Sequence, residues 1–137
     1  MHIKSNKGLV GSDVTIAIII LMLFVTISTT IFYQISMSNI STERYAVANN
    51  LLINVVEYIK LMQYNEYTNA DFSSDNDTNW CKDRINIPDG YNVIIIKYSD
   101  TEKDNIMQEF EVIVKYSIRN EEKEIKIRTL KVNESAS

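Results

Sequence analysis

Hydrophobic and polar residues are sharply separated along this chain, and the longest apolar stretch lies near its start. Residues 14–33 form a twenty-residue run that carries no charged side chain and is mostly apolar. At about 1.5 Å per residue, a helix of this length spans a hydrocarbon core of roughly 30 Å. Lipid forces backbone hydrogen bonds to close within the segment, and no proline interrupts it. We therefore expect a membrane-spanning helix, whose hydroxyls at residues 28–30 can bond back to carbonyls one turn earlier.

An amphipathic pattern follows the apolar run without a turn signal between them. Apolar residues recur at intervals of three and four, which is typical of one helix face: Tyr45, Ala48, Leu52, Val55, Ile59 and Met62. Neither glycine nor proline occurs between residues 12 and 63. The pattern predicts a single helix from about residue 12 to about residue 64, on the order of 75–80 Å long.

The remainder of the chain reads as a long loop followed by three strands. Residues 64–90 are rich in Asn, Asp, Ser and Thr and end in a turn at residues 88–90. Alternating apolar residues predict strands at about 91–98, 109–119 and 123–132, joined by a hairpin turn at residues 119–123. In the second strand the apolar face is expected to hold Phe110, Val112, Val114, Tyr116 and Ile118.

The third strand changes phase along its length. Ile125 and Ile127 alternate with charged residues, whereas Leu130 and Val132 fall on the opposite phase. This slip predicts a bulge or a twist near Thr129. The resulting sheet needs a cover for its apolar face, and the helical stripe is the only candidate of adequate size. The fold class is therefore α+β: a long N-terminal helix, membrane-spanning in its first half and amphipathic in its second, packed on a small antiparallel sheet.

Composition excludes several classes of protein. The chain has 137 residues and a formal net charge of −4, with one cysteine and one histidine. These counts exclude an intramolecular disulfide scaffold, a Cys-rich zinc site and a His-based triad. No phosphate-binding glycine motif is present, and the acidic balance argues against nucleic acid as a partner of this subunit alone. We expect no enzyme activity, no cofactor and no metal.

The residues just before the apolar run form a recognisable junction. They read Lys7-Gly8-Leu9-Val10-Gly11-Ser12-Asp13, preceded by a second lysine, Lys4. This junction resembles the prepilin processing site of type IV pilins and pseudopilins. In that family a short basic leader ends in glycine, a hydrophobic residue follows the scissile bond, and an acid stands fifth in the mature chain. Gly8, Leu9 and Asp13 match these three positions.

The resemblance implies a pilin-like organisation of the chain. Residues 1–8 would be the leader, residues 9–42 the transmembrane and filament-core half of the helix, and residues 43–137 an extracytoplasmic head. Cleavage would fall between Gly8 and Leu9, with N-methylation on Leu9 and assembly registered by Asp13. The implied partners are a prepilin peptidase, other pilin subunits, the inner assembly platform of the machine, and membrane lipid before assembly. Such filaments serve adhesion, motility, secretion or DNA uptake.

Physical chemistry supports the match. An unpaired carboxylate at the edge of a spanning helix is costly, so its presence marks a partner. Cleavage would create a cationic amine at Leu9, one turn from Asp13, and this amine could belong to the same or a neighbouring subunit. Lys4 and Lys7 precede the run and only Arg44 follows it closely, which predicts a cytoplasmic N-terminus and an external head. After processing, the subunit would reside in a cell-surface filament.

The sequence also departs from the family pattern. Asp13 replaces the usual Glu, Leu9 stands where Phe is commoner, Gly11 and Ser12 replace a bulkier pair, and Thr30 stands where many major pilins have proline. These departures favour a minor pilin or pseudopilin over the bulk filament subunit.

Alternative interpretations remain open at this stage. Asp13 could flank an ordinary signal anchor, in which case the chain is a permanently anchored single-pass protein whose outer domain binds a ligand or the cell wall. A cleaved secretory signal fits less well because no A-x-A site follows the run. The helical stripe could dock a separate partner rather than the sheet.

Two features of the long loop can be interpreted either as functional sites or as ordinary structural elements. Residues 75–79 alternate oxygen ligands like the start of a calcium loop, but Trp80 and Asn86 replace its glycine and glutamate. The acidic stretch 71–79 is therefore expected to be a solvated loop. Cys81 is expected to be a lone structural or partly buried thiol rather than a redox site.

Overall fold

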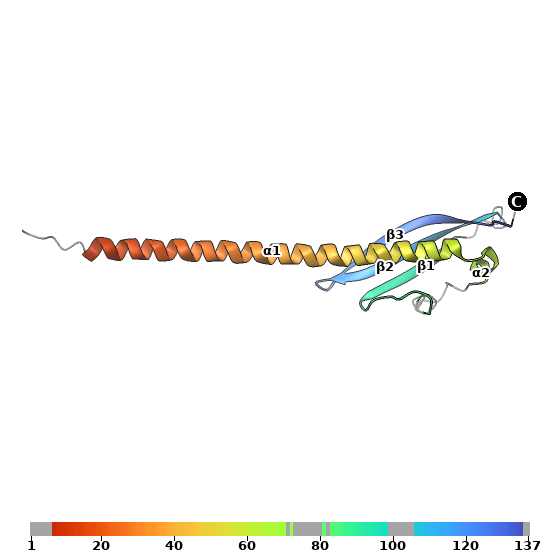
Figure 1. Ribbon diagram of the computed structural model, residues 1–137, viewed down its shortest axis with the longest axis horizontal. Helices are drawn as coiled ribbons and strands as arrows, with labels where there is room; N and C mark the ends of the chain where they lie inside the picture. Colours follow the sequence, from red (N-terminus) through yellow and green to blue (C-terminus); the bar gives the residue numbers. More distant parts are fainter. Residues whose placement is uncertain (1–6, 71, 73–80, 82, 99–105, 136–137) are drawn as a thin grey trace, which may run out of the picture. The chain divides into compact units, whose positions relative to one another are not determined.

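The computed structural model describes residues 7–70, 72, 81, 83–98 and 106–135, without the side chains of residues 7–10. Its elements are α1 (Lys7–Leu61), α2 (Tyr64–Asn69), β1 (Tyr91–Tyr98), β2 (Met107–Ile118) and β3 (Glu121–Val132) (Figure 1). The fold is α+β, with a long N-terminal helix and a three-stranded antiparallel sheet, as predicted. The chain divides into two compact units, residues 1–40 and residues 41–137, and each is described separately below.

The helix α1 begins earlier and ends earlier than the predicted span of about 12–64. Its first residue is Lys7 and its last is Leu61. Gly8 and Gly11 do not prevent the early start, because each residue added to an existing helix gains a backbone hydrogen bond without a new nucleation cost. The end falls just before Met62 and Gln63, where the chain turns into α2.

The first unit presents a helix whose side chains are exposed almost all the way round. From residue 11 to residue 40 only Ser28 and Met37 are partly covered. Two of the hydroxyls at residues 28–30 bond back as expected: Thr29 Oγ1 donates to the carbonyl of Val25, and Thr30 Oγ1 donates to the carbonyl of Thr26 at 2.9 Å. Thr26 Oγ1 likewise donates to the carbonyl of Met22 at 2.8 Å. These side chains thus satisfy their polar groups within the helix.

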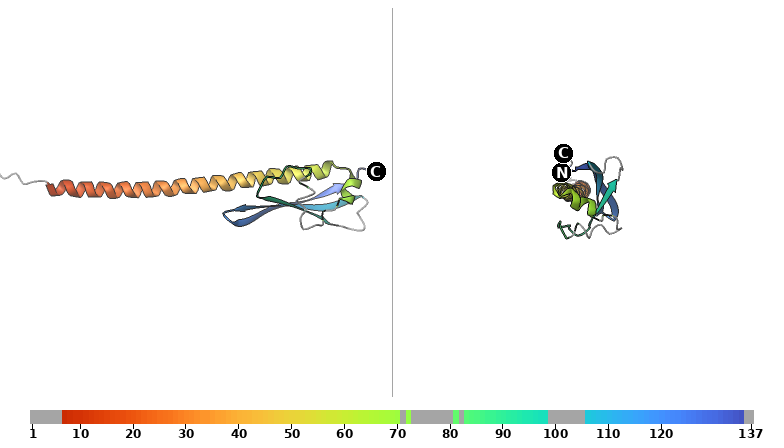
Figure 2. Two further views of the ribbon diagram at one scale, coloured as in Figure 1. Left: turned by 90° about the horizontal axis from the view of Figure 1, so that it is seen from below. Right: turned by 90° about the vertical axis from the view of Figure 1, so that its right-hand side faces the viewer.

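The second unit is built on the sheet, whose strand order is β1-β2-β3 (Figure 2). Tyr91 pairs with Tyr116 at one end of the β1–β2 ladder, and Val112 pairs with Ile127 in the β2–β3 ladder. The bounds of β1 match the predicted strand, whereas β2 and β3 each begin two residues earlier than predicted. The β2–β3 turn is also tighter than expected. It has two residues, Arg119 and Asn120, both with positive φ, as a two-residue hairpin of type I′ requires.

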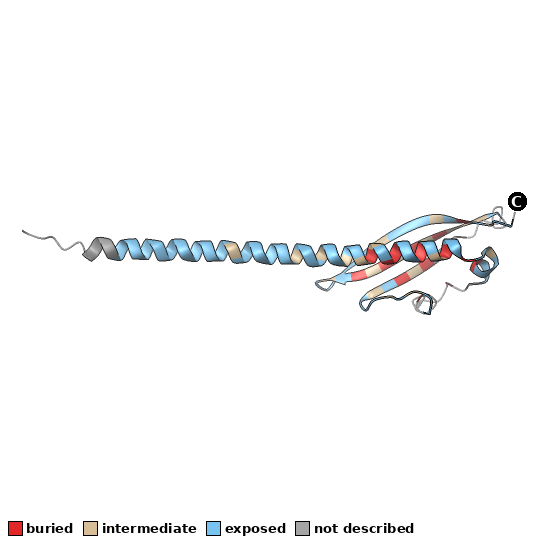
Figure 3. Ribbon diagram, viewed as in Figure 1, coloured by how far each residue is buried: buried red, intermediate tan, exposed pale blue. Residues whose placement is uncertain are grey.

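The core lies between residues 48–62, the last part of α1 and the residue after it, and one face of the sheet (Figure 3). The helix contributes six buried residues, Ala48, Leu51, Leu52, Val55, Val56 and Ile59, and Met62, directly after its end, is the next. The predicted face of β2 is confirmed, with Phe110, Val112, Val114 and Tyr116 buried. The stripe is therefore core packing, not a docking face. Tyr45, which the periodicity also placed in it, is 52% exposed, whereas the neighbouring Arg44 contacts the sheet by donating a 2.8 Å hydrogen bond to the carbonyl of Ser117.

The predicted bulge in β3 is wrong. The register of β2 against β3 continues without interruption from Ile118–Glu121 to Met107–Val132, through Thr129. Leu130 and Val132 do not change to the core face; they stay on the outer face and are about half exposed. The residue that occupies the core-side position between them is Lys131, which is buried. The apparent slip thus reflects a buried lysine rather than an extra residue.

Residues 64–90 are not one continuous loop. The first six, Tyr64–Asn69, form α2, whose Tyr67 is fully buried beside Phe72 and Phe110. Burial of this ring gives tertiary stabilisation to a helix too short to persist alone. The predicted turn at residues 88–90 is confirmed, because Gly90 has a φ of 84° and the amide of Tyr91 donates to the carbonyl of Pro88.

Candidate functional site

The junction that resembles a processing site lies in the first turns of α1. The backbone of Gly8 and Leu9 is helical, whereas residues 1–6 of the predicted leader lie outside the described part of the chain. Because a peptidase binds its scissile bond in an extended form, the first turn would have to unwind before cleavage between Gly8 and Leu9. Two glycines, Gly8 and Gly11, lower the cost of unwinding by about 1 kcal/mol each relative to alanine.

Asp13 is exposed and lies beyond the first turn of α1 in the uncleaved chain. Its position relative to the helix start would change on processing. If the chain began at Leu9, Asp13 would be its fifth residue, close to the partial positive charge of the helix N-terminus and to the new amine. Asp13 is also the last charged residue before the long neutral stretch that ends at Thr42.

The part of α1 that follows Asp13 is long and apolar enough to cross a membrane. Its large apolar side chains are exposed on every side, with Phe24, Met22 and Phe32 at 65–72%. Nothing in the first unit covers this surface among the residues that the structure describes. Apolar area of this extent requires lipid or other protein around it.

Two lysines that the sequence analysis did not single out hold the ends of the two helices. Lys131 of β3 donates hydrogen bonds to the carbonyls of Lys60 and Met62, the second at 2.6 Å. Lys97 of β1 donates to the carbonyls of Tyr67, Thr68 and Ala70, the last at 2.6 Å. The last carbonyls of a helix have no partner within it, and a cation also complements the negative end of the helix dipole.

The sequence does contain a signal for these lysines. Both lie at the core-side phase of their strands, where a charged side chain is costly unless it is paired. Lys97 lies on the same face of β1 as the buried Val93 and Ile95. Its amine also lies 4.9 Å from the centre of the Phe72 ring. A lysine on the apolar phase of a strand therefore indicates a carbonyl cluster nearby.

A polar cluster occupies the outer face of the sheet. Arg128 forms a two-pronged ion pair with Glu109, with nitrogen–oxygen distances of 2.6 and 2.7 Å, and its guanidinium lies 4.0 Å from the centre of the Tyr98 ring. The Tyr98 hydroxyl donates to a Glu111 carboxylate oxygen at 2.9 Å, and this bond raises the pKa of Tyr98 above 10.0. The bond to Glu109 likewise raises the pKa of Arg128.

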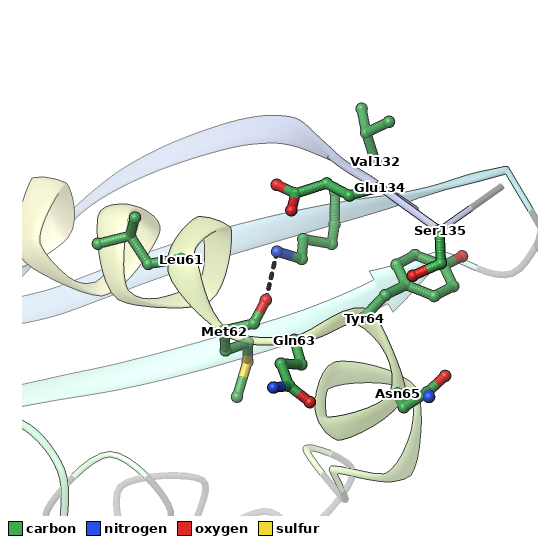
Figure 4. A pocket seen from close by; sticks show the side chains of 9 residues that line it. Leu61, Met62, Gln63, Tyr64, Asn65, Val132, Glu134 and Ser135 are labelled. Carbon is green, nitrogen blue, oxygen red and sulfur yellow. Dashed lines mark hydrogen bonds between the residues drawn. The ribbon is translucent and has the colours of Figure 1, made fainter. Parts of the chain in front are cut away.

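A pocket opens where α1 ends and α2 begins (Figure 4). Its volume is about 350 Å³, and its nine lining residues come from the α1–α2 corner and from the end of β3: Leu61, Met62, Gln63, Tyr64, Asn65, Lys131, Val132, Glu134 and Ser135. The sequence analysis missed this pocket, because its two sides are separated by some 65 residues and only the folded sheet brings them together.

The structure describes only one of the two features of the predicted loop, Cys81. The proposed calcium ligands at residues 75–79 lie outside the described residues, and the described ones contain no group of three His, Cys, Asp or Glu that could hold a metal. Cys81 is a free thiol and fully buried, which is the burial expected of a structural cysteine.

Comparison with known proteins identifies no relative of this chain. No protein-family model matches the chain, no curated protein matches it, and no solved structure matches it. The functional interpretation therefore depends on the residues and geometry described above.

Proposed function

We propose that the chain is a minor pilin or pseudopilin, a structural subunit of a type IV pilus or a related secretion or DNA-uptake filament. The observation that carries this proposal is the junction Gly8-Leu9 with Asp13 in the fifth place after the bond, directly followed by an uncharged helix whose apolar surface is exposed. The subunit is stored in the membrane with its N-terminus in the cytoplasm, cleaved after Gly8, methylated on Leu9 and assembled through α1.

Processing changes the solvation of the first unit. Before cleavage, Lys4 and Lys7 hold the N-terminus at the cytoplasmic surface. Cleavage removes both lysines and leaves a chain whose first thirty-odd residues carry only the new amine and Asp13. These two opposite charges can neutralise each other within or between subunits, so the helix can leave lipid and enter a bundle of similar helices. The partners are the prepilin peptidase, other pilin subunits and the assembly platform.

Mass spectrometry of the protein from its native host tests the proposal. The expected mature chain begins at Leu9 with the mass of one added methyl group. Gly8→Ala should retain the leader and abolish assembly. Gly11→Ala is the matched control, because a Cβ at Gly11 meets nothing within 4 Å, and it should be processed normally. Wild-type protein that still begins at Met1 would contradict the proposal.

The second candidate function is a permanently anchored protein whose outer domain binds a ligand or the cell wall. The pocket at the α1–α2 corner is the observation that favours it. In that case both the wild type and Gly8→Ala keep residues 1–8, and the substitution leaves function unchanged.

A further inference from the structure

The pocket at the end of α1 is lined mainly by polar groups, which between them donate and accept hydrogen bonds. Gln63 and Asn65 contribute amides, Ser135 a hydroxyl and Glu134 a carboxylate. Within the part of the chain that the structure describes, the side chains of Gln63, Asn65 and Glu134 have no hydrogen-bonding or ionic partner. We propose that this pocket binds a neutral saccharide of one or two sugar rings.

The arrangement of the side chains matches the alternating surface of a sugar. Figure 4 shows Ser135 close to the Tyr64 ring, with Glu134 on one side of the corner and the Gln63 and Asn65 amides on the other. A sugar presents adjacent hydroxyls that each donate and accept, which amides and carboxylates can bind two at a time. Its C–H face is apolar and suits the side chain of Leu61, which is 86% exposed beside the pocket.

The charges at the pocket favour a neutral ligand. Lys131 is the one cation of the lining, and its amine is already bonded to the carbonyls of Lys60 and Met62. Glu134 contributes one negative charge, and the C-terminal end of α1 adds partial negative charge. A phosphate or carboxylate ligand would therefore meet repulsion that no available cation offsets.

Size and position also agree with this class of ligand. A volume of about 350 Å³ lies at the lower end of the range for small-molecule pockets. The pocket lies wholly within the second unit, and its lining begins at residue 61, the last residue of α1. The inference does not rest on the proposed filament function, because it depends only on residues of the second unit.

Ligand-observed saturation-transfer NMR tests the inference on the full chain in micelles of a phosphocholine detergent, which has no sugar headgroup. The probes are N,N′-diacetylchitobiose, an acetamido sugar of the kind found in cell walls, and maltose, a plain hexose disaccharide. We expect at least one probe to bind with a Kd of about 10 mM or tighter. Preference for the first probe identifies a cell-wall type of glycan, and preference for the second identifies a plain hexose glycan.

Three exposed residues provide the variants. Asn65→Ala and Glu134→Ala should each weaken binding about tenfold, and Leu61→Ser should weaken it by a similar factor through loss of the apolar contact. Asn86→Ala is the matched control, because Asn86 is exposed and outside the pocket, and its affinity should equal that of the wild type. Continued protection of Cys81 from maleimide confirms that each variant is folded. Absence of binding by both probes, or equal binding by all variants, would overturn the inference.

Discussion

Lys131 Nζ donates a hydrogen bond of 2.6 Å to the carbonyl of Met62, the residue that directly follows the end of α1. The same amine bonds the carbonyl of Lys60, and the side chain is only 4% exposed. One residue of the last strand thereby ties the end of the long helix to the sheet. The burial of a charged amine is offset because it meets two carbonyls that the helix itself cannot satisfy.

Replacement of this lysine should destabilise the second unit. Lys131→Met keeps the length of the side chain but leaves both carbonyls without their donor, which should lower the free energy of unfolding by about 1–3 kcal/mol. Cys81 is the only cysteine and is buried, so maleimide labelling against urea reports unfolding of this unit in the full chain in micelles. Lys126→Met, at an exposed position of β3, is the control and should have little effect. Equal midpoints for the two variants would show that the bonds from Lys131 contribute no stability.

The helix–sheet core should be sensitive to truncation on one side of α1 only. Ile59 is fully buried, so Ile59→Ala should cost about 2–5 kcal/mol through lost apolar contact and the cavity left behind. Ile53 is 45% exposed on the same helix, and Ile53→Ala should change stability by a small fraction of that amount. The same labelling experiment measures both. Similar losses at the two positions would contradict the observed packing.

The titration of Tyr98 should depend on Glu111. Because its pKa in the folded protein is raised above 10.0 by the bond to Glu111, the neutral phenol is favoured. This contribution to stability is present below pH 10 and is lost as the pH rises through the raised pKa. Glu111→Gln should lower the pKa of Tyr98 towards 10. The ultraviolet absorbance of phenolate, taken as the difference between each protein and its Tyr98→Phe version, measures the shift. Glu124→Gln, on the same outer face of the sheet, should leave it unchanged.

Neutralising Asp13 should separate processing from assembly. We expect Asp13→Asn to be cleaved normally, as judged by the mass of the mature chain, but to reduce the assembled fraction about tenfold or more, because a charge interaction of about 1–2 kcal/mol is lost at each subunit addition. Asp13→Glu should restore assembly, since it keeps the charge. Glu43→Gln is the control acid farther along α1. Normal filament yield with Asp13→Asn would remove Asp13 from the assembly mechanism.

Prediction from sequence succeeded where the pattern depends on local geometry. The bounds of β1, the buried face of β2 and most of the helical stripe follow from periods of 2 and 3.6 residues, which need no knowledge of distant contacts. It failed at Thr129, where Leu130 and Val132 seemed to demand a core position. Both stay about half exposed on the outer face. Hydrophobicity alone could not reveal that the core side of β3 needs a hydrogen-bond donor at residue 131, where Lys131 bonds the end of α1.

The N-terminal junction and the neutral helix are properties of the sequence by itself, because charge, spacing and apolar length are read directly from consecutive residues. The tertiary structure decided which lysines become helix caps, where α2 forms and where a pocket opens. These features depend on which carbonyls and side chains come together from distant parts of the chain, as Lys131 and Met62 do, and such proximity arises only when the sheet and the end of α1 pack against each other.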